Sequence, residues 1–108
     1  MLPISKVQNL ILKHAQLEKE LSSGEIDKKN IAEKSKEYSD LNEIIKEANS
    51  YKDFEKNKID LDKMINDSNS DKDIKELALT ELEKLKKNNE INEKKIKLFL
   101  LPKDEADT

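Results

Sequence analysis

Residues Asp67–Asp73 (sequence DSNSDKD) have side chains that could ligate a cation. Oxygen-bearing side chains at alternate positions resemble the start of a calcium-binding loop between two helices. Such a loop needs Gly at its sixth position and Glu at its twelfth, but Lys72 and Ala78 occupy those positions here. The segment is therefore interpreted as the acidic tip of a helical hairpin, and its candidate partner contacts are Asp67, Ser68, Asn69, Ser70 and Asp71.

His14 is the only histidine, and no second His or Cys could complete a metal site with it. It lies beside an apolar stripe, which predicts a packing or surface role. A single glycine excludes a Gly-rich phosphate loop, and no Ser-His-Asp set has a fold to support it. The sequence therefore predicts no catalytic site, no metal site and no cofactor in this segment.

Two lysine runs, Lys84–Lys87 and Lys94–Lys97, could form a basic strip for RNA. Glutamates lie between these lysines, and the chain has a net charge of −3, whereas phosphate binding needs uncompensated positive charge. The runs are interpreted as a solvated helix face with ion pairs, and no sequence-specific DNA binding is expected.

The composition indicates the elements that must carry these residues. Of 108 residues, 42% are charged and 34% hydrophobic, with one Gly, two Pro and no Cys. Because 24 acidic residues nearly balance 21 basic ones, the composition is typical of long helices or coiled coils rather than of a disordered chain. No apolar run approaches the roughly 20 residues that span a bilayer, and no export signal is recognisable, so we expect a cytoplasmic protein without membrane contact.

Apolar residues at steps of three and four predict three helices, over about residues 4–21, 28–66 and 71–99. Gly24 can cap the first helix in the left-handed conformation, and Asp27 can cap the second. The second helix would be about 57 Å long and needs a long antiparallel partner. The expected fold is all-α, with a short N-terminal helix packed on a long antiparallel helical hairpin that resembles a coiled coil.

Three details of these helices follow from the same pattern. The apolar stripe of the second helix shifts, which predicts a bend near Asn49–Ser50. Ser70 and Asp73 have the spacing of a capping box at the start of the third helix. Asn89 and Asn92 lie on the stripe of the third helix, where they either fix the register as buried amides or mark a loosely packed stretch.

The third helix ends in an apolar run just before Pro102. Its residues are expected to pack on something outside this chain: Leu98, Phe99, Leu100 and Leu101. We therefore predict one helical domain over residues 1–101 and the start of a linker over residues 102–108.

Four segments, in order, resemble the bacterial release factor 1 family of translation termination factors. Residues 34–41 (KSKEYSDL) resemble a segment near the start of that family, and residues 60–67 (DLDKMIND) resemble its acidic and hydrophobic run before the hairpin turn. Residues 74–82 (IKELALTEL) resemble its M-x-E-x-A-x-x-E-L pattern, and residues 100–104 (LLPKD) resemble the close of its first domain. The last motif favours this family over the sister factor, release factor 2.

The resemblance implies a three-helix N-terminal domain of a factor that recognises UAA and UAG codons and triggers hydrolysis of peptidyl-tRNA. It implies two partners, the ribosome at the stalk base near protein L11 and the remaining release factor domains. The family's Gly-Gly-Gln loop and codon-reading tripeptide are absent, so these domains would begin just after Thr108. We expect this segment to contact or position the factor on the ribosome and to have no active site.

Two other functions share the hairpin geometry. A tRNA-binding helical arm, such as that of seryl-tRNA synthetases, is disfavoured by the acidic charge balance. A generic coiled-coil adaptor is disfavoured by the shift in the stripe, which a strict parallel heptad dimer would not have.

Overall fold

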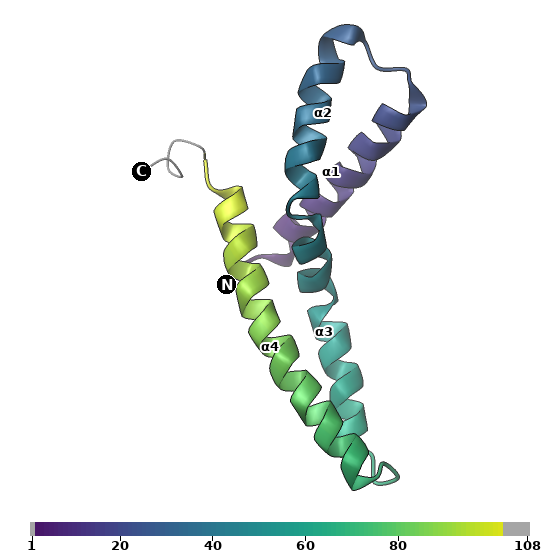
Figure 1. Cartoon of the computed structure of the whole chain (residues 1–108), viewed down its shortest axis with the longest axis vertical. Coiled ribbons are helices and arrows are strands. Elements are labelled where there is room, and N and C mark those ends of the chain that lie inside the picture. Colours follow the sequence, from purple (N-terminus) through teal and green to yellow (C-terminus); the bar gives the residue numbers. More distant parts are fainter. Residues whose placement is uncertain (1, 103–108) are drawn as a thin grey trace.

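The computed structural model describes residues 2–102, and within them it contains four α-helices and no β-strand. The helices are α1 (Ile4–Ser23), α2 (Lys28–Asn42), α3 (Ile45–Asn66) and α4 (Lys72–Leu100). The all-α class and the long antiparallel hairpin are confirmed, because α3 and α4 pack side by side and are joined by a short turn (Figure 1). The expected polar tail, Lys103–Thr108, lies outside the described residues.

Local signals account for most helix ends. Gly24 follows α1 at φ +73°, the left-handed conformation that glycine adopts without a steric penalty. Asp27 precedes α2, as expected, although its side chain makes no capping hydrogen bond. The predicted capping box of Ser70 and Asp73 is wrong, because α4 begins at Lys72 with Asp71 at the N-cap position and without a side-chain capping bond.

The predicted single helix over residues 28–66 is interrupted at Glu43–Ile44. The Glu43 N–H donates to the Asp40 carbonyl at 3.2 Å, and the Ile44 N–H donates to the Leu41 carbonyl at 3.0 Å, so the chain tightens into a turn. The helices on the two sides of this turn, α2 and α3, run in different directions because α2 packs on α1, whereas α3 packs on both α1 and α4. The predicted bend near Asn49–Ser50 is therefore wrong in position, since both residues lie within α3.

The core lies where the α1–α2 pair of helices meets the α3–α4 pair. Five buried side chains form this cluster, which we call the hub: Leu2, Val7, Ile44, Ala48 and Ile96. Leu10, Ile11, Tyr51 and Phe99 pack around it. The hub therefore joins the N-terminal segment, α1, the α2–α3 turn and the end of α4.

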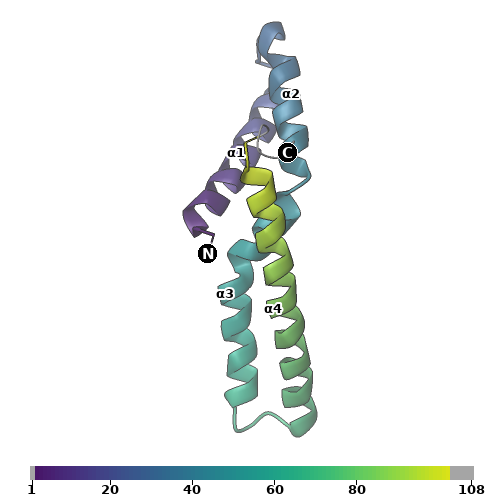
Figure 2. The ribbon, with the colours of Figure 1, turned by 90° about the vertical axis from the view of Figure 1, so that its left-hand side faces the viewer.

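Two arms extend from the hub in opposite directions, one made of α1 and α2 and the other of α3 and α4 (Figures 1 and 2). The molecule measures 60 × 38 × 19 Å, so it is long and thin. Each arm is only two helices thick, and stripe residues far from the hub stay exposed for that reason. Ile31, Met64 and Ile74 are 43%, 49% and 46% exposed. None of the helices in residues 2–102 is long and apolar enough to cross a membrane.

Candidate interaction surfaces

The turn between α3 and α4 forms the far end of one arm, and Asp67 gives it a defined shape. The Asn69 N–H donates to the Asp67 carboxylate at 2.9 Å, and the Ser70 N–H donates to the Asp67 carbonyl at 3.2 Å. Asp67 thus accepts hydrogen bonds from two backbone N–H groups of the turn. The side chains of the five predicted contact residues, Asp67–Asp71, are exposed except for that of Ser70, which is half-buried.

This tip has an acidic surface. Asp67, Asp71 and Asp73 lie within seven residues, and Lys72 is the cation among them. Within residues 2–102, however, no group of three or more His, Asp or Glu side chains converges in a way that could hold a metal ion. The tip can present carboxylates and backbone groups to a partner.

The apolar end of α4 divides into inward and outward side chains. Phe99 packs against the hub, whereas Leu98, Leu100 and Leu101 are 66%, 37% and 41% exposed. Leu100 and Leu101 also line a recess of about 370 Å³ together with Leu2, Pro3, Lys6 and Lys97. The outward leucines form an apolar surface of the kind that usually contacts another protein segment.

The tip and the apolar end lie at opposite ends of α4. This helix has 29 residues, so at 1.5 Å per residue the two surfaces are roughly 43 Å apart. The structure therefore does not bring the two predicted sets of contact residues together. A partner at one end leaves the other end accessible.

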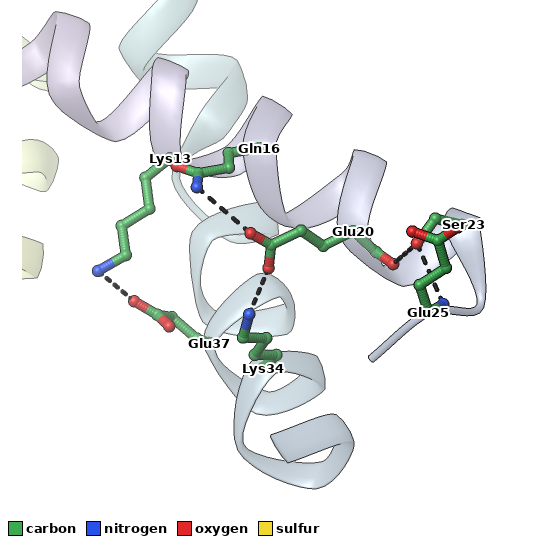
Figure 3. Close-up of polar contacts among 7 residues, drawn as sticks. All are labelled: Lys13, Gln16, Glu20, Ser23, Glu25, Lys34 and Glu37. Atoms are coloured by element: carbon green, nitrogen blue, oxygen red, sulfur yellow. Dashed lines mark hydrogen bonds and ion pairs between the residues drawn. The ribbon is translucent and has the colours of Figure 1, made fainter. Parts of the chain in front are cut away.

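Charged side chains connect the two helices of the other arm (Figure 3). Lys34 of α2 donates to the Glu20 carboxylate at 2.6 Å, and Gln16 donates to the other oxygen of Glu20 at 3.3 Å. The Lys34 ammonium lowers the pKa of Glu20, mainly through this hydrogen bond. Lys13 pairs with Glu37 at 2.5 Å in the same interface. Partly exposed pairs of this kind are expected to orient α1 and α2 more than to stabilise them.

His14 has the packing role that its position predicted. Its ring stacks on Tyr38 with centroids 4.8 Å apart, and its Nε2 lies 2.5 Å from the Asn42 side-chain oxygen. The imidazole thereby joins α1 to α2. Tyr38 and Asn42 lie 24 and 28 residues further along the chain, so local spacing gave no signal of this contact.

The N-terminal segment is fixed to the hairpin close to the hub. The Tyr51 hydroxyl donates to the Leu2 carbonyl at 3.4 Å. Burial raises the pKa of Tyr51, and the Glu93 carboxylate raises it further. Lys97 hydrogen-bonds Glu93 and lowers the pKa of that carboxyl. These groups hold the N-terminal segment, α3 and α4 together near the hub.

Comparisons with known proteins show which family this chain resembles. The family model described as "PCRF domain" matches residues 10–108. A curated peptide chain release factor 1 from Pelagibacter ubique (strain HTCC1062) is 62% identical over 107 residues. The match covers 99% of this chain and 30% of that relative, so the chain spans less than a third of the relative's length. No solved structure matches the chain.

Proposed function

The chain belongs to the PCRF domain family, and from this premise we propose that it is the N-terminal helical domain of a bacterial type 1 peptide chain release factor. The observation that carries the proposal is the similarity to a curated release factor 1 over nearly the whole chain. The all-α fold with a long hairpin supports it, because the sequence resemblance implied a helical first domain. On this proposal, residues 1–101 form the domain and residues 102–108 begin the linker.

The intact factor is proposed to act in the cytoplasm, recognise UAA and UAG codons on the ribosome, and trigger hydrolysis of peptidyl-tRNA. This chain contributes positioning rather than chemistry. Its sequence contains one glycine, so a Gly-Gly-Gln motif cannot lie within it. The long, thin two-armed shape suits a spacer that holds other domains at a set distance from a contact point.

The two ends of α4 are assigned separate roles in this proposal. The tip Asp67–Asp71 contacts the ribosome at the stalk base, near protein L11. The outward side chains among Leu98, Phe99, Leu100 and Leu101 pack on the remaining release factor domains. Both assignments rest on exposure, on the acidic character of the tip and on the apolar character of the other end.

A peptide-release assay tests the absence of chemistry. The purified 108-residue chain, added alone to ribosomes stalled at a UAA codon, is expected to leave the release rate at its background value. The full-length factor from the same coding sequence is the positive control. Release by the chain alone, above background and proportional to its concentration, would contradict the proposal.

A second assay tests the tip. Ser68→Lys places a long cation at an exposed position of the turn and leaves Asp67, which shapes the turn, in place. In the full-length factor this variant is expected to raise KM for ribosomes severalfold and to leave kcat unchanged, because the tip supplies binding and no chemistry. Ser35→Lys, which makes the same change at another exposed serine, on α2, is the matched control. Equal kinetic constants for the two variants would rule out the tip as the contact.

A further inference from the structure

The joint between α2 and α3, Glu43–Ile44, is close to helical geometry. Glu43 has φ −68° and ψ −23°, and Ile44 has φ −117° and ψ −9°, both of right-handed helical type. The φ of Ile44 departs most from the value of a regular helix, by roughly 50°. Neither residue is glycine or proline. A modest backbone rotation at the joint would therefore make α2 and α3 one continuous helix.

Backbone groups at the joint lack hydrogen bonds that a continuous helix would give them. Among residues 2–102, no carbonyl accepts from the N–H groups of residues 45–47, and no side chain caps the start of α3. The Ala48 N–H is the first of α3 to bond, with the Ile44 carbonyl at 2.9 Å. In a continuous helix the N–H groups of residues 43–47 would each bond to the carbonyl four residues back. Closing the joint would therefore add backbone hydrogen bonds.

Helix α1 holds the joint in its bent form. It packs on both α2 and α3, which contact each other little. Val7 of α1 and Leu2 ahead of it are buried in the hub together with Ile44 of the joint. A short loop, residues 24–27, connects α1 to α2, so α1 must follow α2 when α2 turns. Turning α2 into line with α3 would therefore draw Leu2 and Val7 out of the hub.

We propose that the Glu43–Ile44 joint is a two-state hinge. In the bent state, Leu2 and Val7 fill the hub and the first N–H groups of α3 stay unpaired. In the closed state, the N-terminal segment (residues 2–7) leaves the hub and α2 continues into α3 as one helix. The two states exchange apolar burial for backbone hydrogen bonds, so a change at the hub shifts their populations.

Relaxation-dispersion NMR on the 108-residue chain tests the hinge, because it detects a minor state that exchanges in microseconds to milliseconds. Val7→Ala removes two buried carbon groups from the hub, so the population of the closed state should rise roughly tenfold. The Ile44 Cα chemical shift of that state should be helical. Leu12→Ala, at a position of α1 that is 66% exposed, is the matched control and should change the population less than about twofold. The absence of such a state in Val7→Ala, or a population equal to that of the control, would overturn the proposal.

A proline at position 46 separates helix closure from other motions. Lys46 is exposed in the first turn of α3, where proline is tolerated, and its N–H has no carbonyl partner within residues 2–102. Lys46→Pro should change Tm by less than about 4 °C, whereas Lys56→Pro, at an exposed position inside α3, should lower Tm by about 10 °C or more.

Position 46 would lie in the interior of the continuous helix, where proline is excluded. Lys46→Pro should therefore abolish the closed state in the Val7→Ala background. Exchange at the joint that persists in the double variant, or equal Tm losses for the two proline variants, would refute the hinge.

The recess beside the apolar end of α4 links the hinge to the rest of the factor. Leu2 and Pro3 line it together with Leu100 and Leu101. The remaining release factor domains, proposed to pack on these leucines, would cover the N-terminal segment and hold it in the hub. This link rests on the proposed function, whereas the hinge itself is measured on the chain alone, so the two can fail separately. In the full-length factor the closed population of Val7→Ala should be severalfold lower than in the chain alone, and an equal population would contradict the link.

Discussion

Ile96 is the side chain whose loss should show most clearly that the hub holds the two arms together. It is fully buried near the end of α4 and contacts the cluster that includes Leu2, Val7, Ile44 and Ala48. Ile96→Ala removes three carbon groups from this cluster. The remaining side chains belong to several separate segments, so they cannot easily collapse into the space.

The cost can be estimated from the buried groups. At about 0.8 kcal/mol for each buried carbon group, the transfer term is about 2.4 kcal/mol. The cavity adds about 1 kcal/mol, and the higher helix propensity of alanine returns a few tenths. We expect Ile96→Ala to lower the free energy of unfolding by about 3 kcal/mol.

Urea unfolding followed by circular dichroism measures this change. With a slope near about 1.5 kcal/mol per M, the midpoint should fall by about 2 M. Ile91→Ala is the matched control, because Ile91 lies on the same helix and is 49% exposed. Its cost should stay below about 1 kcal/mol, since half of the side chain is already in water and no cavity forms. Equal midpoints for the two variants would refute the placement of the core at the hub.

Three further predictions concern the helix ends and the arms. Gly24→Ala should cost about 1 kcal/mol in a thermal unfolding experiment, because the φ of +73° strains any residue with a Cβ even though the space around it is open. Lys34→Met should raise the pKa of Glu20, measured by NMR titration. Since that pKa is depressed in the folded chain, the stabilisation by this pair is present at neutral pH and is lost as the pH falls through the folded pKa; an unchanged Glu20 titration would contradict this. Asp67→Ala should destabilise the tip by about 1 kcal/mol and speed amide exchange at Asn69, because the Asp67 carboxylate accepts a hydrogen bond from the Asn69 N–H. Unchanged exchange at Asn69 would contradict this role of Asp67.

The sequence predicted the helix ends well where a local signal exists. Gly24 ends α1 through its own backbone conformation, and the polar turn after Asn66 separates α3 from α4, so both boundaries were predicted to within a few residues. The end of α4 before Pro102 follows from the restricted backbone ahead of proline. These features depend on neighbouring residues alone.

The interruption at Glu43–Ile44 could not be located in the same way. No glycine or proline marks it, and the apolar spacing continues through it, because Leu41, Ile44 and Ala48 keep helical steps. The break exists because α2 and α3 pack on different partners, which only the tertiary structure specifies. The shift in the stripe was a real signal of two packing faces, but it placed the bend several residues too late.

The candidate surfaces also combine features that the sequence could predict with features that only the tertiary structure specifies. Exposure of the tip and of Leu98 could be expected from polarity and from position in the chain. The inward turn of Phe99 depends on the hub, and the contact of His14 with Tyr38 and Asn42 depends on how α1 meets α2.

The most direct test of the positioning role is steady-state peptide release by the full-length factor with and without residues 4–100. If this domain supplies placement and no chemistry, its removal should raise KM for UAA- and UAG-programmed ribosomes by about tenfold or more, with kcat within about twofold and with codon selectivity unchanged. A collapse of kcat at unchanged KM, or release at codons that the intact factor ignores, would contradict the account.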